Sequence, residues 1–263
     1  MEKVLVVGGA GFIGSNAAAH YLEKGFDVSI FDNFSRFGTK ENADWLEKNY
    51  PKLKIIKGDI RTDRLLLEKH VQEKDVIIHL AAQTAVTNSL KKPEEDFDIN
   101  LRGTFHLLES LRKNKSEATL IFASTNKVYG ELENIKVKEK QTRHEFDGLP
   151  FGIPETQGIE FNSPYSCSKG ASDQYVSNYG KSYGLNTVVL RQSCIYGERQ
   201  FGVEDQGWLS WFTIAVLQNK KISVYGNGKQ IRDVLFVNDL VDCFELAHKK
   251  IKTLKRGEVF NIG

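Results

Sequence analysis

The sequence predicts an α/β fold in which a doubly wound parallel sheet is covered by helices on both faces. Short apolar segments alternate along the 263 residues with longer segments of helical length. The short segments are apolar at successive positions, which is typical of strands buried on both faces. The first of them runs directly into the glycine-rich turn Gly8–Gly14, and this order of strand, turn and helix is typical of a Rossmann-type fold.

The expected strands are short and rich in valine, isoleucine and leucine. They lie at residues 4–7, 27–31, 53–56, 75–80, 118–122 and 186–190. Between them, segments such as 12–24 and 97–113 have helical length and spacing. The polar stretch 131–164 is too long for an ordinary connection, so we expect a functional insertion there.

After residue 195 the pattern changes, and we expect a main domain over 1–195 followed by a small, C-terminally truncated lobe over 196–263. The elements expected in this lobe are a helix over 208–218, a strand over 222–225, an amphipathic helix over 239–250 with Asn238 as its N-cap, and a strand over 259–262. The last strand has no helix after it to cover it, which suggests that the lobe continues beyond the sequence given.

Composition excludes several classes of protein. Lys+Arg 36 against Asp+Glu 34 leaves a formal charge of +2, which gives no support to a nucleic-acid partner. No apolar run reaches the roughly 18 residues of a membrane-spanning helix, and the first residues lack the pattern of an export signal. The three cysteines and six histidines show no metal-ligand spacing, so we expect no metal site and a reducing, cytoplasmic location.

The glycine turn predicts a dinucleotide site. Gly8 permits the tight turn, Gly11 lets a diphosphate approach the backbone, and Gly14 lets the next helix pack closely. The helix N-terminus adds free N–H groups. Asp32, at the end of the second strand, can bind both hydroxyls of an adenine ribose and would repel a 2′-phosphate, which favours NAD over NADP. Arg36 is the opposing observation, because an arginine there could hold that phosphate. The alternative is a glycine-rich turn without a ligand.

A tyrosine and a lysine at positions i and i+4 predict a proton-transfer group. Tyr165 and Lys169 share one face of a helix that Pro164 begins. A free tyrosine has a pKa of ~10, and we expect the nearby ammonium to lower it by roughly 3 units, toward working pH. Thr125 follows the fifth strand, where its hydroxyl could bridge a substrate alcohol and the phenol. The alternatives are a surface Tyr–Lys pair and a capping threonine.

Together these elements resemble the extended short-chain dehydrogenase/reductase family, and within it the NAD-dependent epimerase/dehydratase branch that acts on nucleotide sugars. The likeness covers essentially the whole chain, and it is greatest to epimerases of CDP-linked deoxysugars. The segments that carry it are Gly8–Gly14, Ser124–Gly130, Ser163–Gly170 with Tyr165-x-x-x-Lys169, Asp205–Phe212 and Gly228–Val234. Within them, Asn126–Lys127 and Gln206–Phe212 are the most specific.

This resemblance implies NAD as cofactor, bound by residues 1–195, and a nucleotide sugar, preferably CDP-linked, bound with the help of 196–263. The implied catalytic residues are Thr125, Tyr165 and Lys169. The residues expected to contact NAD are Gly8, Gly11, Phe12, Ile13, Asp32, Asn33, Ser35, Arg36, Asp59, Ile60, Leu80, Ala81, Ala82, Gln83, Asn100, Ala123, Tyr165, Lys169 and Gln192. The residues expected to contact the sugar nucleotide are Thr84, Thr125, Asn126, Lys127, Ser193, Arg199, Gln206, Val224 and Arg232.

The resemblance also implies the reaction, which is epimerisation through transient oxidation to a keto sugar and return of the hydride. Oxidation at carbon 2 is implied by the resemblance alone. Epimerisation at carbon 4, net reduction and a non-catalytic NAD-binding protein remain open. A 4,6-dehydratase needs an acid and a base beside the threonine, where Asn126 and Lys127 stand, so we disfavour dehydration.

Two further expectations follow from the family. Relatives commonly pair two long helices from each subunit, so we expect a homo-oligomer, a dimer or tetramer, formed through 97–113 and 165–183. Many relatives also have an asparagine that contacts the diphosphate after the sixth strand. Here that position is Cys194, which weakens this part of the expected diphosphate site.

Overall fold

A seven-stranded parallel sheet forms the centre of the protein, in the order β11-β8-β5-β4-β1-β2-β3. The computed structural model describes residues 1–204 and 206–263, so Asp205, the first residue of one motif named above, lies outside the described residues. The strands are β1 (Lys3–Val7), β2 (Asp27–Asp32), β3 (Lys54–Lys57), β4 (Val76–His79), β5 (Thr119–Thr125), β8 (Asn186–Gln192) and β11 (Glu258–Ile262). The α/β, doubly wound parallel fold is therefore confirmed, with a strand at each of the six main-domain positions expected.

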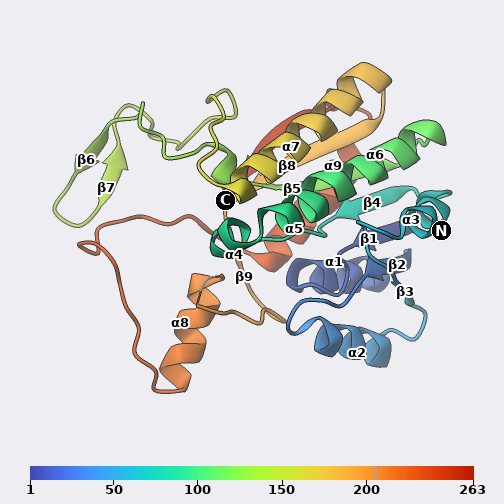
Figure 1. Ribbon diagram of the computed structural model, residues 1–263, viewed down its shortest axis with the longest axis horizontal. Coiled ribbons are helices and arrows are strands. Elements are labelled where there is room, and N and C mark those ends of the chain that lie inside the picture. Colours follow the sequence, from blue (N-terminus) through green and yellow to red (C-terminus); the bar gives the residue numbers. More distant parts are fainter. Residues whose placement is uncertain (205) are drawn as a thin grey trace.

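Successive side chains of β1 explain why both faces of the sheet are covered. Val4 and Val6 point into one apolar cluster, and Leu5 and Val7 point into a second cluster on the other face. The first cluster is closed by α1 (Phe12–Glu23), α2 (Thr39–Asn49) and α9 (Val237–Lys250). The second is closed by α3 (Arg64–Val71), α6 (Gly103–Lys113) and α7 (Pro164–Tyr183). Figure 1 shows α6 and α7 along one side of the sheet and α1 and α2 along the other.

The remaining elements connect or extend this layered body. The chain passes from β4 to α6 through α4 (Val86–Lys91), α5 (Pro93–Phe97) and the π-helical turn η1 (Asp98–Arg102), and a short 3₁₀ turn, η2 (Asn126–Val128), follows β5. The others are β6 (Val137–Glu139), β7 (His144–Phe146), β9 (Cys194–Tyr196), α8 (Trp208–Leu217) and β10 (Val234–Phe236). Across the described residues, every helix is too short or too polar to span a bilayer.

Two parts of the chain stand away from the central sheet in Figure 1. One is the antiparallel hairpin β6–β7, which lies in the expected insertion. The other is α8 with the segment after it, and the two parts touch. The His144 amide donates to the Lys229 carbonyl at 2.8 Å, and the Lys229 amine lies 2.6 Å from the Glu139 carboxylate.

The region after residue 195 differs from expectation in three ways. β11 pairs in parallel with β8, and α9 packs in the first apolar cluster, so both belong to the main body and not to a separate lobe. The strand expected over 222–225 was wrong, because this segment is irregular and exposed and has no strand beside it. Asn238 is not the N-cap of α9, because the helix already begins at Val237.

Candidate active site

A cavity of about 560 Å³ opens where β1, β2, β4, β5 and β8 end. In parallel α/β sheets this edge is where ligands bind. Residues from every one of these strand ends face it. The predicted residues on its wall are Gly8, Gly11, Phe12, Ile13, Asp32, Asn33, Ser35, Arg36, Asp59, Ile60, Leu80, Ala81, Ala82, Gln83, Thr84, Ala123, Tyr165, Lys169, Gln192, Arg199 and Gln206.

The glycine turn is shaped to accept a diphosphate. Gly8 has a φ of +84°, and a Cβ there would lie 2.5 Å from the Ala81 nitrogen, so no larger residue fits. A Cβ on Gly14 would lie 2.2 Å from the Gly8 oxygen, which explains the close packing of α1. Gly11 lies on the cavity wall, where the absence of a side chain lets a ligand approach the backbone. The first turn of α1 holds no acidic side chain, so no negative charge repels an anion from the helix N-terminus.

Asp32 is fixed at the end of β2 by two backbone N–H groups. One carboxylate oxygen accepts from the Ala10 amide at 3.0 Å and the other from the Phe34 amide at 2.8 Å. Burial raises the pKa of this carboxyl, and the two N–H groups and the charge of Arg36 oppose the shift. Each oxygen keeps a free lone pair for a ribose hydroxyl. The residues present therefore fit NAD at the turn and at the adenosine end.

Arg36 reaches across the cavity. Its guanidinium donates to the Thr84 hydroxyl at 2.9 Å and also hydrogen-bonds the Gln206 side chain, which in turn bonds Thr84. The three residues come from the loops after β2 and β4 and from the segment before α8. Arg36 therefore links both walls of the cavity, and its charge also faces Tyr165.

The beginning of α7 sets the position of the tyrosine. Ser163 caps the helix: its hydroxyl accepts from the Ser166 amide at 3.2 Å, and the Ser166 hydroxyl accepts from the Ser163 amide at 3.0 Å. Tyr165 then lies in the first turn and Lys169 one turn later, both buried. Thr125, at the end of β5, is close enough to the Tyr165 phenol for its hydroxyl to lower the pKa of the phenol. The structure thus brings together the three predicted catalytic residues.

The expected effect of Lys169 on the phenol was wrong in this structure. Burial raises the pKa of Tyr165, and the groups that oppose the shift are Thr125 and Arg36. The Lys169 amine instead donates to the Ala123 carbonyl at 2.5 Å, above the ring of Phe122. Burial lowers the pKa of Lys169 to about 8. Sequence spacing placed the two side chains on one face of a helix but did not reveal how strongly the interior disfavours both charges.

Several predicted contacts do not line the cavity. Asn100 is buried behind the loop after β4, where its side-chain oxygen accepts from the Gln83 amide at 2.9 Å. Val224 and Arg232 lie on the exposed segment after α8. Arg199 lies on the wall, but its guanidinium stacks over Trp45. The other predicted residues outside the lining are Thr125, Asn126, Lys127 and Ser193.

Sequence reasoning missed a buried charged group beneath the site. Asp173 is fully buried on α7 and accepts two hydrogen bonds at 2.9 Å from Arg191 and one at 2.7 Å from Ser124. Asp173 follows Lys169 at i+4, and this spacing was the available signal. The cavity wall also includes residues that were not predicted, among them Phe31, Asn42, Lys92, Glu95, Ile99, Ser124, Gln200 and Phe201.

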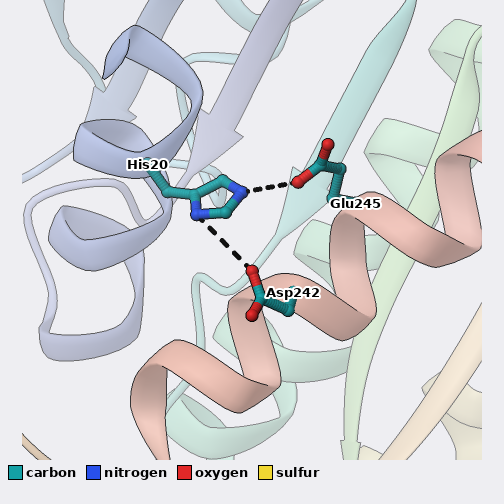
Figure 2. A group of neighbouring side chains, drawn as sticks. All are labelled: His20, Asp242 and Glu245. Atoms are coloured by element: carbon teal, nitrogen blue, oxygen red, sulfur yellow. Dashed lines mark hydrogen bonds and ion pairs between the residues drawn. The ribbon is translucent and has the colours of Figure 1, made fainter. Parts of the chain in front are cut away.

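One further cluster of ionisable side chains lies away from the cavity. His20 of α1 points between Asp242 and Glu245 of α9, and the ligand-type atoms of all three lie within 4.8 Å of one another (Figure 2). Glu245 is already neutralised by Lys24 and Lys249, each at 2.5 Å. We therefore interpret the cluster as an ion-pair network that fastens α9 to α1.

A dinucleotide turn that shares one cavity with a buried tyrosine and lysine is the arrangement of the extended short-chain dehydrogenase/reductases, and fold and site place the protein in this class. The match to known families is narrower. The model described as "NAD dependent epimerase/dehydratase family" matches residues 4–263, so the chain belongs to that family.

Individual relatives agree with this assignment. CDP-paratose 2-epimerase of Salmonella typhi is 43% identical over 269 residues, which cover 99% of this chain and 78% of that protein. A putative UDP-glucose 4-epimerase of Methanocaldococcus jannaschii is 34% identical over 261 residues, covering 99% and 76%. The structure of UDP-glucose 4-epimerase from Thermus thermophilus in complex with NAD matches with a TM-score of 0.79 at 32% identity, covering 99% and 77%. The chain is therefore an NAD-dependent enzyme of the nucleotide-sugar epimerase and dehydratase kind.

Proposed function

We propose that the protein is an NAD-dependent epimerase of a CDP-linked deoxysugar. The observation that carries this proposal is the meeting of Tyr165 and Lys169 with the glycine turn on the wall of one cavity, with Thr125 at the phenol. The preference for a CDP sugar, and for inversion at carbon 2, rests on the 43% identity with a protein named CDP-paratose 2-epimerase.

In the proposed reaction, NAD held by the glycine turn and Asp32 would supply a reversible hydride acceptor, so that the sugar carbon can be oxidised to a ketone and reduced again from its opposite face. Tyr165, as phenolate, takes the hydroxyl proton of that carbon, directly or through Thr125, and gives it back to the keto oxygen. Lys169 is assigned the role of binding the nicotinamide ribose; in this structure its amine donates to the Ala123 carbonyl and does not act on the phenol. Arg36, on the opposite wall, adds a positive charge that favours the phenolate.

The residues after Thr125 argue against dehydration. Asn126 and Lys127 are exposed and stand where a dehydratase needs an acid and a base. An amide cannot protonate a leaving hydroxyl, and an ammonium is a poor base. Contacts to the nucleotide sugar from Thr84, Arg199 and Gln206 are supported by their place on the wall. Those from Asn126, Lys127, Ser193, Val224 and Arg232 rest on the resemblance alone.

The proposal is tested by incubating the purified protein with a panel of CDP, UDP and dTDP sugars and following conversion without change of mass. We expect a CDP-deoxysugar to be converted, and Tyr165→Phe to lower its turnover by about 10²–10⁴-fold. Tyr175→Phe is the matched control, because Tyr175 lies on the same helix and does not line the cavity. Conversion at the normal rate by Tyr165→Phe would refute the role of the phenol, and loss of mass by water would indicate dehydration.

We also propose that the protein is a homo-oligomer that pairs α6 and α7 of two subunits. Phe105, Tyr175 and Tyr183 are 39%, 44% and 55% exposed on these helices, and aromatic rings of this size are enriched in interfaces. Sedimentation of the protein at micromolar concentration would test this. A monomer there would contradict the proposal.

A further inference from the structure

A buried carboxylate outside the catalytic group lies directly beneath it. Asp96, on α5, is fully buried, although the acidic run around it in the sequence looks like an exposed first turn of a helix. Its neighbours Glu95 and Asp98 do have cationic partners, Lys92 at 3.2 Å and Arg102 at 3.0 Å. Among the described residues Asp96 forms no ion pair, although the charge of Lys169 lowers its pKa.

Hydrogen bonds hold this carboxylate to the elements on both sides of the site. One oxygen accepts from the Ser168 hydroxyl at 2.5 Å. The other accepts from the Gln83 side-chain amide at 2.9 Å and from the Asn100 amide at 3.2 Å. Ser168 stands immediately before Lys169 on α7, and Gln83 belongs to the loop that carries Thr84 along the cavity wall. Asp96 therefore joins the helix of the catalytic pair to a loop of the expected cofactor site.

We propose that Asp96 is a positioning residue for the proposed reaction: it locks Tyr165 and Lys169 against the cofactor loop, and its charge sets how readily the pair gains and loses protons. The inference rests on the proposed function, because it assigns a role toward those two catalytic groups. Burial raises the pKa of Asp96, and the three hydrogen-bond donors and the charge of Lys169 oppose this shift and favour the charged form.

The sign of the electrostatic effect follows from the surroundings of the pair. The groups that face it are Asp96 from α5, Asp173 from α7, Arg36 from the loop after β2 and His79 from β4. Asp173 is paired with Arg191 and still raises the pKa of Lys169, more than Asp96 does, and burial lowers the pKa of His79 to about 3, so that histidine is uncharged. The charge of Asp96 raises the pKa of both Tyr165 and Lys169. Removing the charge should therefore lower both pKa values together.

The test is the pH profile of turnover for wild type and Asp96→Asn. The asparagine keeps an oxygen for Gln83 and Asn100, and its amide can donate to Ser168, whose hydroxyl can turn to the Tyr165 carbonyl, 3.2 Å away. We expect both limbs of the profile to move to lower pH by about one unit. Glu94→Gln removes an exposed charge from the same helix and should leave the profile unchanged.

Ser168→Ala separates position from charge, since it breaks the link to α7 and keeps the carboxylate. We expect it to lower turnover without moving either limb. If Asp96→Asn behaves in the same way, or if its limbs move to higher pH, the electrostatic part of the proposal is overturned. If Asp96→Asn keeps both the height and the position of the wild-type profile, the whole proposal is overturned.

A second readout does not need a substrate. The tyrosinate absorbance of Tyr165, obtained as the difference between each protein and its Tyr165→Phe variant, should appear at lower pH in the Asp96→Asn background. An unchanged titration overturns the inference even where turnover cannot be measured. If wild type converts no nucleotide sugar and the titration still shifts, the proposed function fails and the role of Asp96 toward the pair stands.

Discussion

Removing Asp173 alone should destabilise the fold far more than removing Asp173 and Arg191 together. Asp173 is fully buried and Arg191 is 4% exposed, and two hydrogen bonds of 2.9 Å join them. Asp173→Leu leaves the guanidinium in the interior without a counter-charge, and Ser124 loses its acceptor. Breaking a buried pair in this way costs about 3–5 kcal/mol.

The double variant Asp173→Leu/Arg191→Met removes both charges and fills the space with apolar atoms. Such replacements are often neutral, and here Ser124 and Tyr129 each lose a partner, so we expect a loss of no more than about 2 kcal/mol. Urea unfolding followed by tryptophan fluorescence and circular dichroism gives the free energy of unfolding of each variant. The reasoning fails if Asp173→Leu costs less than about 1 kcal/mol, or if the double variant loses the sum of the two single losses.

Three further predictions concern the glycine turn, the lysine and Arg36. Gly8→Ala should abolish NAD binding in calorimetry, because the new Cβ meets the loop after β4 at 2.5 Å. Gly25→Ala, at the same φ of +84° with open space around it, should bind NAD normally and lose only about 1–3 kcal/mol of stability. The pKa of Lys169 is about 8 in the folded protein and 10.5 in the unfolded chain. Between these two pH values the unfolded chain binds more protons than the folded protein, so the free energy of unfolding rises with pH. Lys169→Met should therefore be more stable at pH 7 by up to ~3 kcal/mol, a gain that disappears above the unfolded pKa; equal urea midpoints at pH 7 would contradict this. Arg36→Met removes a charge that lowers the pKa of Tyr165, so the acid limb of the turnover profile should move to higher pH, and an unmoved limb would count against the charge reaching the phenol.

The main features of the fold could be predicted from local sequence. A strand buried on both faces needs successive apolar residues, and the seven segments of this kind in the main sheet, including Val259–Ile262, all stand out in the sequence. The position of the last of these strands was not predictable in the same way. β11 pairs with β8, which is distant from it in the sequence, and no local sequence pattern predicts such a pairing. For the same reason the segment 222–225 looked like a strand although no neighbouring strand lies beside it.

In the site, too, the sequence spacing predicted which residues take part, whereas their burial and their pKa depend on tertiary packing. The glycine turn, Asp32 and the Tyr165–Lys169 pair each have a local signature, and the cavity brings them together. The pKa of the phenol depends on burial, on the Thr125 hydroxyl and on the charges of Asp96 and Arg36, none of which lies on the helix of the phenol. Asp96 is the clearest case, because only the packing of α5 against α7 turns an ordinary acidic residue into a buried anion.

The contact between the β6–β7 hairpin and Lys229 fixes the segment after α8 to the insertion. Arg232 is three residues further along the same segment, so the hairpin also helps to hold Arg232 in place. Residues 137–146 do not line the cavity, so shortening the hairpin would shift this arginine with little effect on the cavity wall. Variation in the length of this hairpin would therefore change the position of Arg232, for which we propose a contact with the substrate, without changing the residues at the phenol.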